Sequence, residues 1–165
     1  MRLTSKGRYA VSAMVDLNKQ QGEGPVTLAA ISERQFLSLA YLGQRFRRLR
    51  ESGRVRSVRG PGGGYLLAKE SVDISIADIS RAVNEPVRTT MCENGVRGCH
   101  RGNRCDTHQL WESLGQHIYR FLDAVSLDQV CNEDVFLNNV ELADVENYIL
   151  KPEVHETKVN IATIS

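Results

Sequence analysis

Residues 38–69 read SLAYLGQRFRRLRESGRVRSVRGPGGGYLLAK, and this stretch decides the fold. Its first half repeats apolar residues at three- and four-residue spacing, which predicts an amphipathic helix that begins after the capping residue Ser38. The apolar positions are Leu39, Leu42, Phe46 and Leu49. Its second half has two strand-like runs, 54–59 and 65–69, around the glycine-rich segment 60–64. We expect a β-hairpin there, because glycine adopts the backbone angles that a tight turn requires.

The same patterns extend outward from this stretch. On its N-terminal side, the sequence predicts helices over 5–18 and 27–34. On its C-terminal side, it predicts a helix over 75–84, a long helix over 108–125 and a short helix that begins after Ser126. We therefore expect a mainly α-helical protein with a small β-hairpin. Its architecture would be a winged helix-turn-helix followed by a long dimerisation helix.

The charge of the chain is unevenly distributed, although its formal net charge is only +1. Residues 1–70 carry 13 Lys and Arg against 5 Asp and Glu, whereas residues 71–165 carry 8 against 15. The segment charges of +8 and −7 predict a basic surface that binds a polyanion and a separate part that does not. Residues 132–165, with a net charge of −5, form an acidic tail that we expect to be mobile.

Three helices followed by a glycine-tipped hairpin are typical of winged helix-turn-helix proteins, which place the third helix in the major groove of DNA. Gln44 and Arg45 are candidates for reading base edges, because glutamine pairs with adenine and arginine with guanine. Further arginines of the helix and hairpin would contact phosphates. The predicted DNA-binding residues are Ser38, Tyr41, Gln44, Arg45, Arg48, Arg50, Arg59, Gly60 and Pro61. The alternative is a solvated basic helix beside a structural hairpin.

Enzymatic activity is not expected. The glycine-rich loop lies between two strands and lacks the Lys-Ser/Thr ending of phosphate-binding loops. No nucleophile, metalloprotease or paired-carboxylate pattern stands out in the sequence. There is also no apolar run of membrane-spanning length or signal peptide, so we expect a cytoplasmic protein.

A cluster of metal-ligand residues follows the predicted DNA-binding domain. Cys92, Cys99, Cys105 and His108 are spaced Cys-x6-Cys-x5-Cys-x2-His, which suits one tetrahedral metal or a small iron-sulfur cluster. Zinc fits the same donors on spacing alone, and His100 competes with His108 as the fourth ligand. Cys131 lies apart from the others and is expected to be an inert buried thiol.

These features divide the chain into four parts. We expect a winged helix-turn-helix domain over 1–84, a cluster-binding loop over 85–107, a dimerisation helix with a short following helix over 108–131, and the acidic tail over 132–165. Because the ligand set follows the DNA-binding domain and precedes the dimerisation helix, its position favours a sensor over a purely structural metal site.

Several segments resemble the IscR-like iron-sulfur regulators, a family of dimeric bacterial winged-helix transcription regulators. They are MRLTSKGRYAV at 1–11, ISERQ at 31–35, VRGPGGGYLL at 58–67 and the Cys-Cys-Cys-His loop. The resemblance implies a homodimer that binds operator DNA and holds a 2Fe-2S cluster through Cys92, Cys99, Cys105 and His108. It also implies control of cluster-assembly genes, with cluster-assembly proteins as the cluster donors.

The sequence departs from the family pattern at three places. Six residues separate Cys92 from Cys99, where five are usual; Gly43 stands where a glutamate is common; and the acidic tail has no counterpart. A related branch senses nitric oxide through a 4Fe-4S cluster with an N-terminal aspartate ligand, but Arg8 occupies that position here. That branch, a redox-sensing relative and a zinc-stabilised nucleic-acid-binding module without sensing are the alternatives.

Overall fold

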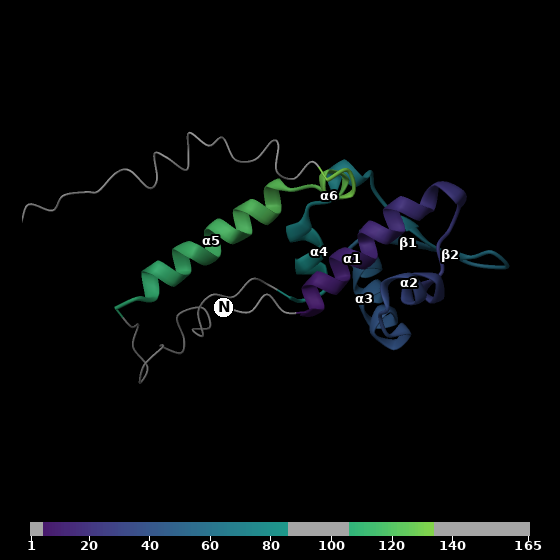
Figure 1. Cartoon of the computed structure of the whole chain (residues 1–165), viewed down its shortest axis with the longest axis horizontal. Helices are drawn as coiled ribbons and strands as arrows, with labels where there is room; N and C mark the ends of the chain where they lie inside the picture. The colour runs from purple at the N-terminus through teal and green to yellow at the C-terminus, as the bar shows by residue number, and fades with distance from the viewer. Residues whose placement is uncertain (1–4, 86–105, 134–165) are drawn as a thin grey trace, which may run out of the picture.

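The computed structural model describes residues 5–85 and 106–133. These residues form a mainly helical molecule with one two-stranded antiparallel sheet, which confirms the predicted fold class (Figure 1). The elements are α1 (Ser5–Gln20), the 3-10 helix η1 (Gln21–Glu23), α2 (Leu28–Gln35), α3 (Leu39–Glu51), β1 (Val55–Val58), β2 (Gly64–Leu67), the 3-10 helix η2 (Ser71–Asp73), α4 (Ile76–Ala82), α5 (His108–Ala124) and α6 (Leu127–Cys131). The predicted cluster-binding loop and acidic tail lie almost entirely outside the described residues.

Side-chain caps fix the starts of α2, α3, α4 and α6, as the sequence predicts, whereas α5 begins without one. The hydroxyl of Ser38 accepts a hydrogen bond from the backbone N–H of Tyr41 at 3.4 Å at the start of α3. Ser126 and Gln129 form a complete capping box at α6. Ser75 caps α4 through the backbone N–H of Asp78, while the Asp78 carboxylate binds Arg54 and Arg81.

The hydrophobic core lies where α1 packs against α2, α3, α4 and α6. Its largest fully buried side chains include Phe46, Met14, Leu17, Ile31, Leu42 and Leu49. Asp16 is also buried and pairs with Arg34 of α2 at 2.7 Å, which joins α1 to α2 through a charged contact. Leu39 differs from the prediction, because it lies at the first position of α3 and is 52% exposed instead of facing the core.

The wing is the hairpin of β1 and β2, with Val55 opposite Leu67 and Val58 opposite Gly64. Val26 adds an isolated bridge to Tyr65, so the segment before α2 is paired with β2 of the wing. A Cβ atom at Gly64 would lie 2.5 Å from the carbonyl oxygen of Val26. Glycine is therefore required at this position for the backbone approach that anchors the wing.

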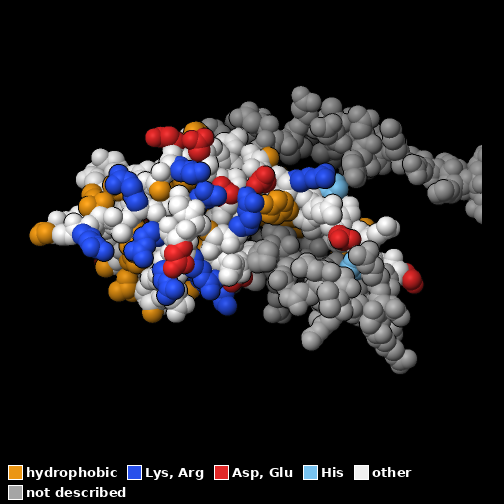
Figure 2. All heavy atoms as spheres, turned by 180° about the vertical axis from the view of Figure 1, so that it is seen from behind, with side chains coloured by type: hydrophobic (Ala, Val, Ile, Leu, Met, Phe, Trp, Pro, Cys, Tyr) orange, Lys and Arg blue, Asp and Glu red, His pale blue; other side chains and the backbone are white. Residues whose placement is uncertain are grey.

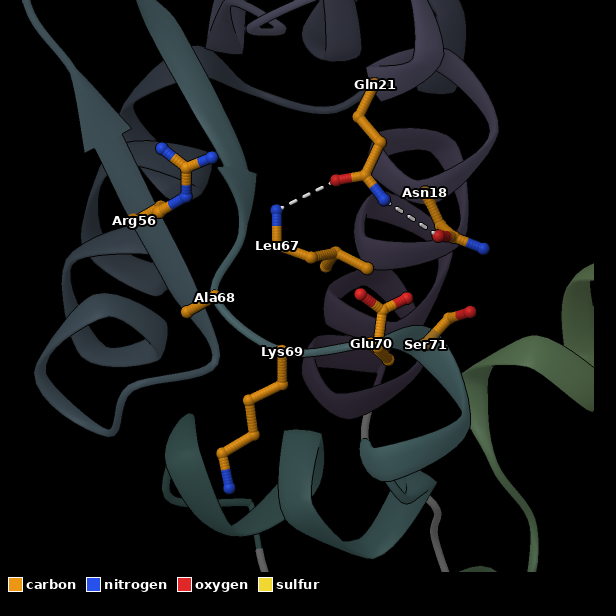
Figure 3. A pocket seen from close by; sticks show the side chains of 8 residues that line it. All are labelled: Asn18, Gln21, Arg56, Leu67, Ala68, Lys69, Glu70 and Ser71. Atoms are coloured by element: carbon orange, nitrogen blue, oxygen red, sulfur yellow. Dashed lines mark hydrogen bonds between the residues drawn. The ribbon is translucent and has the colours of Figure 1, made fainter.

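A chain of side-chain amides ties β2 to α1 and α6. The backbone N–H of Leu67 donates to Oε1 of Gln21 at 2.9 Å, and Nε2 of Gln21 donates to Oδ1 of Asn18 at 3.0 Å (Figure 3). Nδ2 of Asn18 then donates to Sγ of Cys131 at 3.2 Å. The Cys131 thiol is partly buried in this contact. Asn18, Gln21 and Leu67 also line a shallow polar hollow, together with Arg56 and residues 68–71 (Figure 3).

Residues 5–85, which hold α1 to α4 and the wing, form the winged-helix part of the molecule. Helix α5 extends away from this part, while α6 returns to it (Figure 1). The return is held by backbone hydrogen bonds from Ile76 to Val125 at 2.9 Å and from Leu127 to Ile74 at 2.8 Å. Val125 and Leu127 are buried in the same core as α1 and α4. The C-terminal end of α5 is thus fixed to the core that α1 and α4 share, and its N-terminal end projects beyond it.

Candidate nucleic-acid interface

The outer face of α3 carries part of the predicted DNA-binding set. Gln44 and Arg50 are exposed, and Ser38 is exposed at the N-cap of the helix. Arg47 is exposed on the same face and pairs with Glu51 at 2.9 Å one turn later. Gly43 lies beside Gln44, and an added Cβ there would meet no atom within 4 Å.

Arg45 and Arg48 point in a different direction. The Nη1 atom of each donates to the carbonyl oxygen of Val83, at 3.0 Å in both cases. Arg45 is only 9% exposed, because its helical position falls between the buried residues Leu42 and Leu49. The guanidinium of Arg45 thus caps the end of α4, and the role of Arg45 in reading base edges stays a prediction.

Tyr41 of α3 contacts α1. Its ring lies 5.1 Å from the Arg45 guanidinium carbon and packs edge-on against Tyr9, with 6.1 Å between ring centroids. Its hydroxyl donates to the carbonyl oxygen of Lys6 at 2.5 Å. Burial raises the pKa of Tyr41, and the nearby Arg45 opposes part of that rise. Tyr41 therefore positions the start of α1 beside α3.

The wing contributes a second exposed set. Arg59, Gly60 and Pro61 are exposed at its tip, and the positive φ of Gly60, 102°, is one that only glycine adopts readily. Arg56 is exposed on β1, whereas Arg54 is partly buried and pairs with Asp78 at 3.1 Å. The arginines of this region thus divide into exposed side chains and side chains with structural partners.

Basic side chains gather over the winged-helix part of the molecule (Figure 2). The exposed ones are Lys6, Arg8, Lys19, Arg34, Arg47, Arg50, Arg56, Arg59, Lys69 and Arg81. They come from α1 to α4 and the wing. This surface can neutralise several phosphates at once, which the charge distribution of the sequence predicts.

Asp78 connects the start of the wing to α4 and α5. Its Oδ1 atom lies 3.1 Å from Arg54 and 2.6 Å from Arg81, and its side chain is 15% exposed. Arg81 also lies 3.4 Å from Asp123 of α5, and its guanidinium stacks over Tyr119 of the same helix at 5.6 Å. The position of α5 is therefore linked to the base of the wing through one shared carboxylate.

His108 is the one predicted metal ligand within the described residues. It is the first residue of α5 and is 6% exposed, with Nε2 lying 3.6 Å from a carboxylate oxygen of Glu112. Cys92, Cys99, Cys105 and the competing His100 lie outside the described residues. Within 5–85 and 106–133, no three His, Cys, Asp or Glu side chains are grouped so that they could hold a metal ion.

Large apolar side chains are exposed along α5 and at the start of α3. Leu110, Trp111 and Phe121 are 61%, 44% and 46% exposed on α5. Phe36, in the turn between α2 and α3, is 94% exposed. These residues belong to the apolar stripe that the sequence predicts for this helix, and its role as a dimer interface stays a prediction. The sequence analysis missed Phe36, because helical periodicity carries no information about a turn residue.

Known proteins resemble this chain over most of its length. The model of the Rrf2 family, described as an iron-dependent transcriptional regulator, matches residues 3–133. The HTH-type transcriptional regulator IscR of Photorhabdus laumondii is 53% identical over 145 residues, which cover 88% of this chain and 84% of that protein. IscR of Yersinia pseudotuberculosis is 52% identical over 147 residues, covering 89% and 87%.

Solved structures give the same picture. T. potens IscR matches with a TM-score of 0.65 and 37% identity, covering 81% of this chain and 88% of that one. CymR, the global cysteine regulator of B. subtilis, matches with a TM-score of 0.67 and 30% identity, covering 81% and 98%. In the described part of the chain, no helix is long and apolar enough to cross a membrane.

Proposed function

The chain belongs to the Rrf2 family of transcriptional regulators, and we propose that it senses iron-sulfur cluster supply through a 2Fe-2S cluster that alters its choice of operator DNA. Like the IscR proteins that it resembles, it is a DNA-binding regulator of the helix-turn-helix type. It is not an enzyme. The proposed target genes are those of cluster assembly and related functions, and the proposed location is the cytoplasm.

The DNA contacts would come from the exposed residues of α3 and the wing. Gln44 and Arg50 are accessible to bases and phosphates, and Ser38 lies at the N-terminal end of the helix that enters the groove. Arg59, Gly60 and Pro61 would contact the adjacent backbone or minor groove. Tyr41, Arg45 and Arg48 would act from behind, by fixing α3 against α1 and α4.

The donor set fits a small cluster. Both thiolate and imidazole ligate [2Fe–2S] iron, in sets of four Cys or of two Cys and two His, and Cys92, Cys99, Cys105 and His108 would supply four donors of these two kinds. His108 is buried at the first position of α5, so a ligand bond at this residue would fix the start of the helix. When bound, the cluster would supply a redox-active and labile group whose retention reports cluster supply.

One observation carries the proposal that this site influences DNA binding. The carbonyl oxygen of Val83 accepts hydrogen bonds from two arginines of α3, and residues 86–105 follow directly after the α4 end to which it belongs. At the other end of that segment, α5 begins with His108. Ligation would thus constrain a segment that lies between the end of α4 and the start of α5. The end of α4 is in turn hydrogen-bonded to α3 through Arg45 and Arg48.

The apolar stripe of α5 supports a homodimer. Leu110 and Phe121 leave about half or more of their surface exposed on a helix that projects from the winged-helix part (Figure 1). Crossing of two such helices would bury these side chains and place two winged helices on one DNA duplex. The proposed partners are therefore operator DNA, a second copy of the chain and cluster-assembly proteins as donors.

Anaerobic purification of the full chain tests the cluster directly. We expect brown protein with sulfur-to-iron charge-transfer absorption and two iron and two sulfide per chain. The variant His108→Ala should lose the cluster several-fold faster, whereas His100→Ala serves as the matched control and should retain it. Colourless protein with one zinc per chain would instead favour the zinc-stabilised module, and faster loss from His100→Ala alone would transfer the ligand role to His100.

A further inference from the structure

Phe36 combines two unfavourable features. It ends α2 with φ at 53° and ψ at 40°, which is the left-handed region that side chains with a Cβ rarely adopt. Its side chain is also 94% exposed, so the ring is hydrated rather than packed in the core. A bulky aromatic residue at such a site costs stability through the backbone and gains none through burial.

The surrounding hydrogen bonds impose this conformation. The backbone N–H groups of Phe36 and Leu37 both donate to the carbonyl oxygen of Ser32, and the Ser32 hydroxyl donates to the carbonyl oxygen of Leu37 at 2.5 Å. The turn geometry is thus set by the helix end and not by the ring. The ring could be removed without loss of any of these hydrogen bonds.

The location of the ring suggests its contact. Phe36 lies two residues before Ser38, the N-cap of α3, and Leu39 at the first helical position is 52% exposed as well. Both exposed apolar residues thus lie within three residues of each other in the chain, at the N-terminal end of the helix proposed to enter the major groove. Helix-turn-helix proteins contact base edges with this end of the recognition helix. Helix α5 lies apart from this turn, so a dimer built on α5 does not cover it (Figure 1).

We propose that Phe36 is a specificity-determining residue that packs its ring against the C5-methyl groups of thymines in the major groove. The methyl group is the apolar feature that distinguishes thymine there, and phenylalanine is one of the side chains suited to contact it. The inference rests on the proposed DNA-binding mode of α3. It adds an apolar contact to a surface whose other predicted contacts are polar or charged.

The test uses a duplex that the wild-type protein selects from a random library. Phe36→Gly removes the ring and the backbone strain, so the variant should unfold at the same or a higher temperature but bind the selected duplex at least about fivefold more weakly, as for one mismatched base pair. Phe36→Leu keeps an apolar side chain and should retain most of the affinity. Val72→Ala, at an exposed apolar residue of η2, is the matched control and should change nothing.

Replacement of thymine by deoxyuridine removes only the methyl group and completes the test. The wild-type protein should bind the uracil duplex more weakly, and Phe36→Gly should bind the thymine and uracil duplexes equally. Equal affinity of Phe36→Gly and the wild type for the selected duplex would overturn the inference, as would a uracil penalty that persists in the variant. Loss of dimerisation without loss of DNA affinity would assign the ring to a protein contact. If the wild-type protein selects no duplex, the DNA-binding mode itself fails.

Discussion

At the scale of single residues, the arginines of α3 have two different roles. Arg50 is exposed, while Arg45 donates to the carbonyl oxygen of Val83 and contacts the ring of Tyr41. The Nε atom of Arg45 is buried and has no hydrogen-bond partner in the described part of the chain. The desolvation of this guanidinium is only partly offset by the hydrogen bond that it makes. Its structural role is to fix α3 against the end of α4.

Arg45→Ala should therefore lower the stability of the fold, whereas Arg50→Ala should lower the affinity for DNA. We expect Arg45→Ala to lower the free energy of unfolding by about 1.5 to 3 kcal/mol, because a charged hydrogen bond and buried side-chain packing are lost. Arg50→Ala should change it by less than about 0.5 kcal/mol, but should weaken DNA binding and reduce the salt slope by about 1 per protomer, which is about 2 for the proposed dimer. Urea denaturation and affinity measurements over a salt series give both values. Equal stabilities of the two variants would contradict the division.

The role of Arg45 shows where sequence reasoning reaches its limit. The helical spacing of Leu42, Arg45 and Leu49 places Arg45 on the inward face, so the sequence contained its burial although the sequence analysis did not use it. Its partner was not, because Val83 is 38 residues away and only the packing of α3 against α4 brings the two together. The predicted DNA-binding set remains a prediction, and its exposed members are the ones that fit it best.

At the scale of elements, Asp78 is the contact that joins the wing to the helices behind it. Its carboxylate binds Arg54, which directly precedes β1, and Arg81 of its own helix. Arg81 in turn reaches Asp123 of α5. Movement of α5 relative to α4 would therefore change the ion pair between Asp78 and Arg54 at the base of the wing.

Asp78→Asn should weaken this link. We expect a loss of about 2 to 4 kcal/mol in the free energy of unfolding, because the partly buried Arg54 loses its charged partner. Glu51→Gln is the matched control, since the Arg47–Glu51 pair is exposed and its removal should cause no measurable loss. Thermal and urea unfolding of both variants provide the comparison. A loss as large for Glu51→Gln as for Asp78→Asn would refute the structural role of Asp78.

The elements themselves were largely predictable. Capping residues at Thr27, Ser38 and Ser126 mark helix starts through local hydrogen bonds, and the glycine-rich tip marks the hairpin. These signals are local, so sequence alone contains them. The exposure of Leu39 and the bridge between Val26 and Tyr65 depend on how elements pack, which periodicity does not determine.

At the scale of the whole molecule, the described chain has a basic winged-helix part and a projecting α5. The wing and the projecting end of α5 extend in opposite directions from α1 (Figure 1). Among the described residues, the exposed Lys and Arg side chains belong to the first of these parts except for Arg120 of α5, and the exposed apolar residues Leu110 and Phe121 belong to the second. This separation allows dimerisation and DNA binding to use different surfaces.

Phe121→Glu should therefore convert the proposed dimer to a monomer. A charge at this half-exposed position would be buried without a partner if two α5 helices pack together. Sedimentation velocity at micromolar concentration measures the change. Val72→Glu, at a 62% exposed residue of η2, should remain dimeric. A wild-type protein that sediments as a monomer would remove the proposed interface.

The central claim is that cluster occupancy changes which DNA the protein binds, and the most direct test is the affinity of the cluster-loaded and cluster-free dimers for duplexes selected separately by each form. The measurement is made anaerobically over a salt series. The account predicts that the two forms select different sequences, that each prefers its own duplex by at least about tenfold, and that both lose affinity steeply with salt. Identical selected sequences with equal affinities for both forms would contradict it.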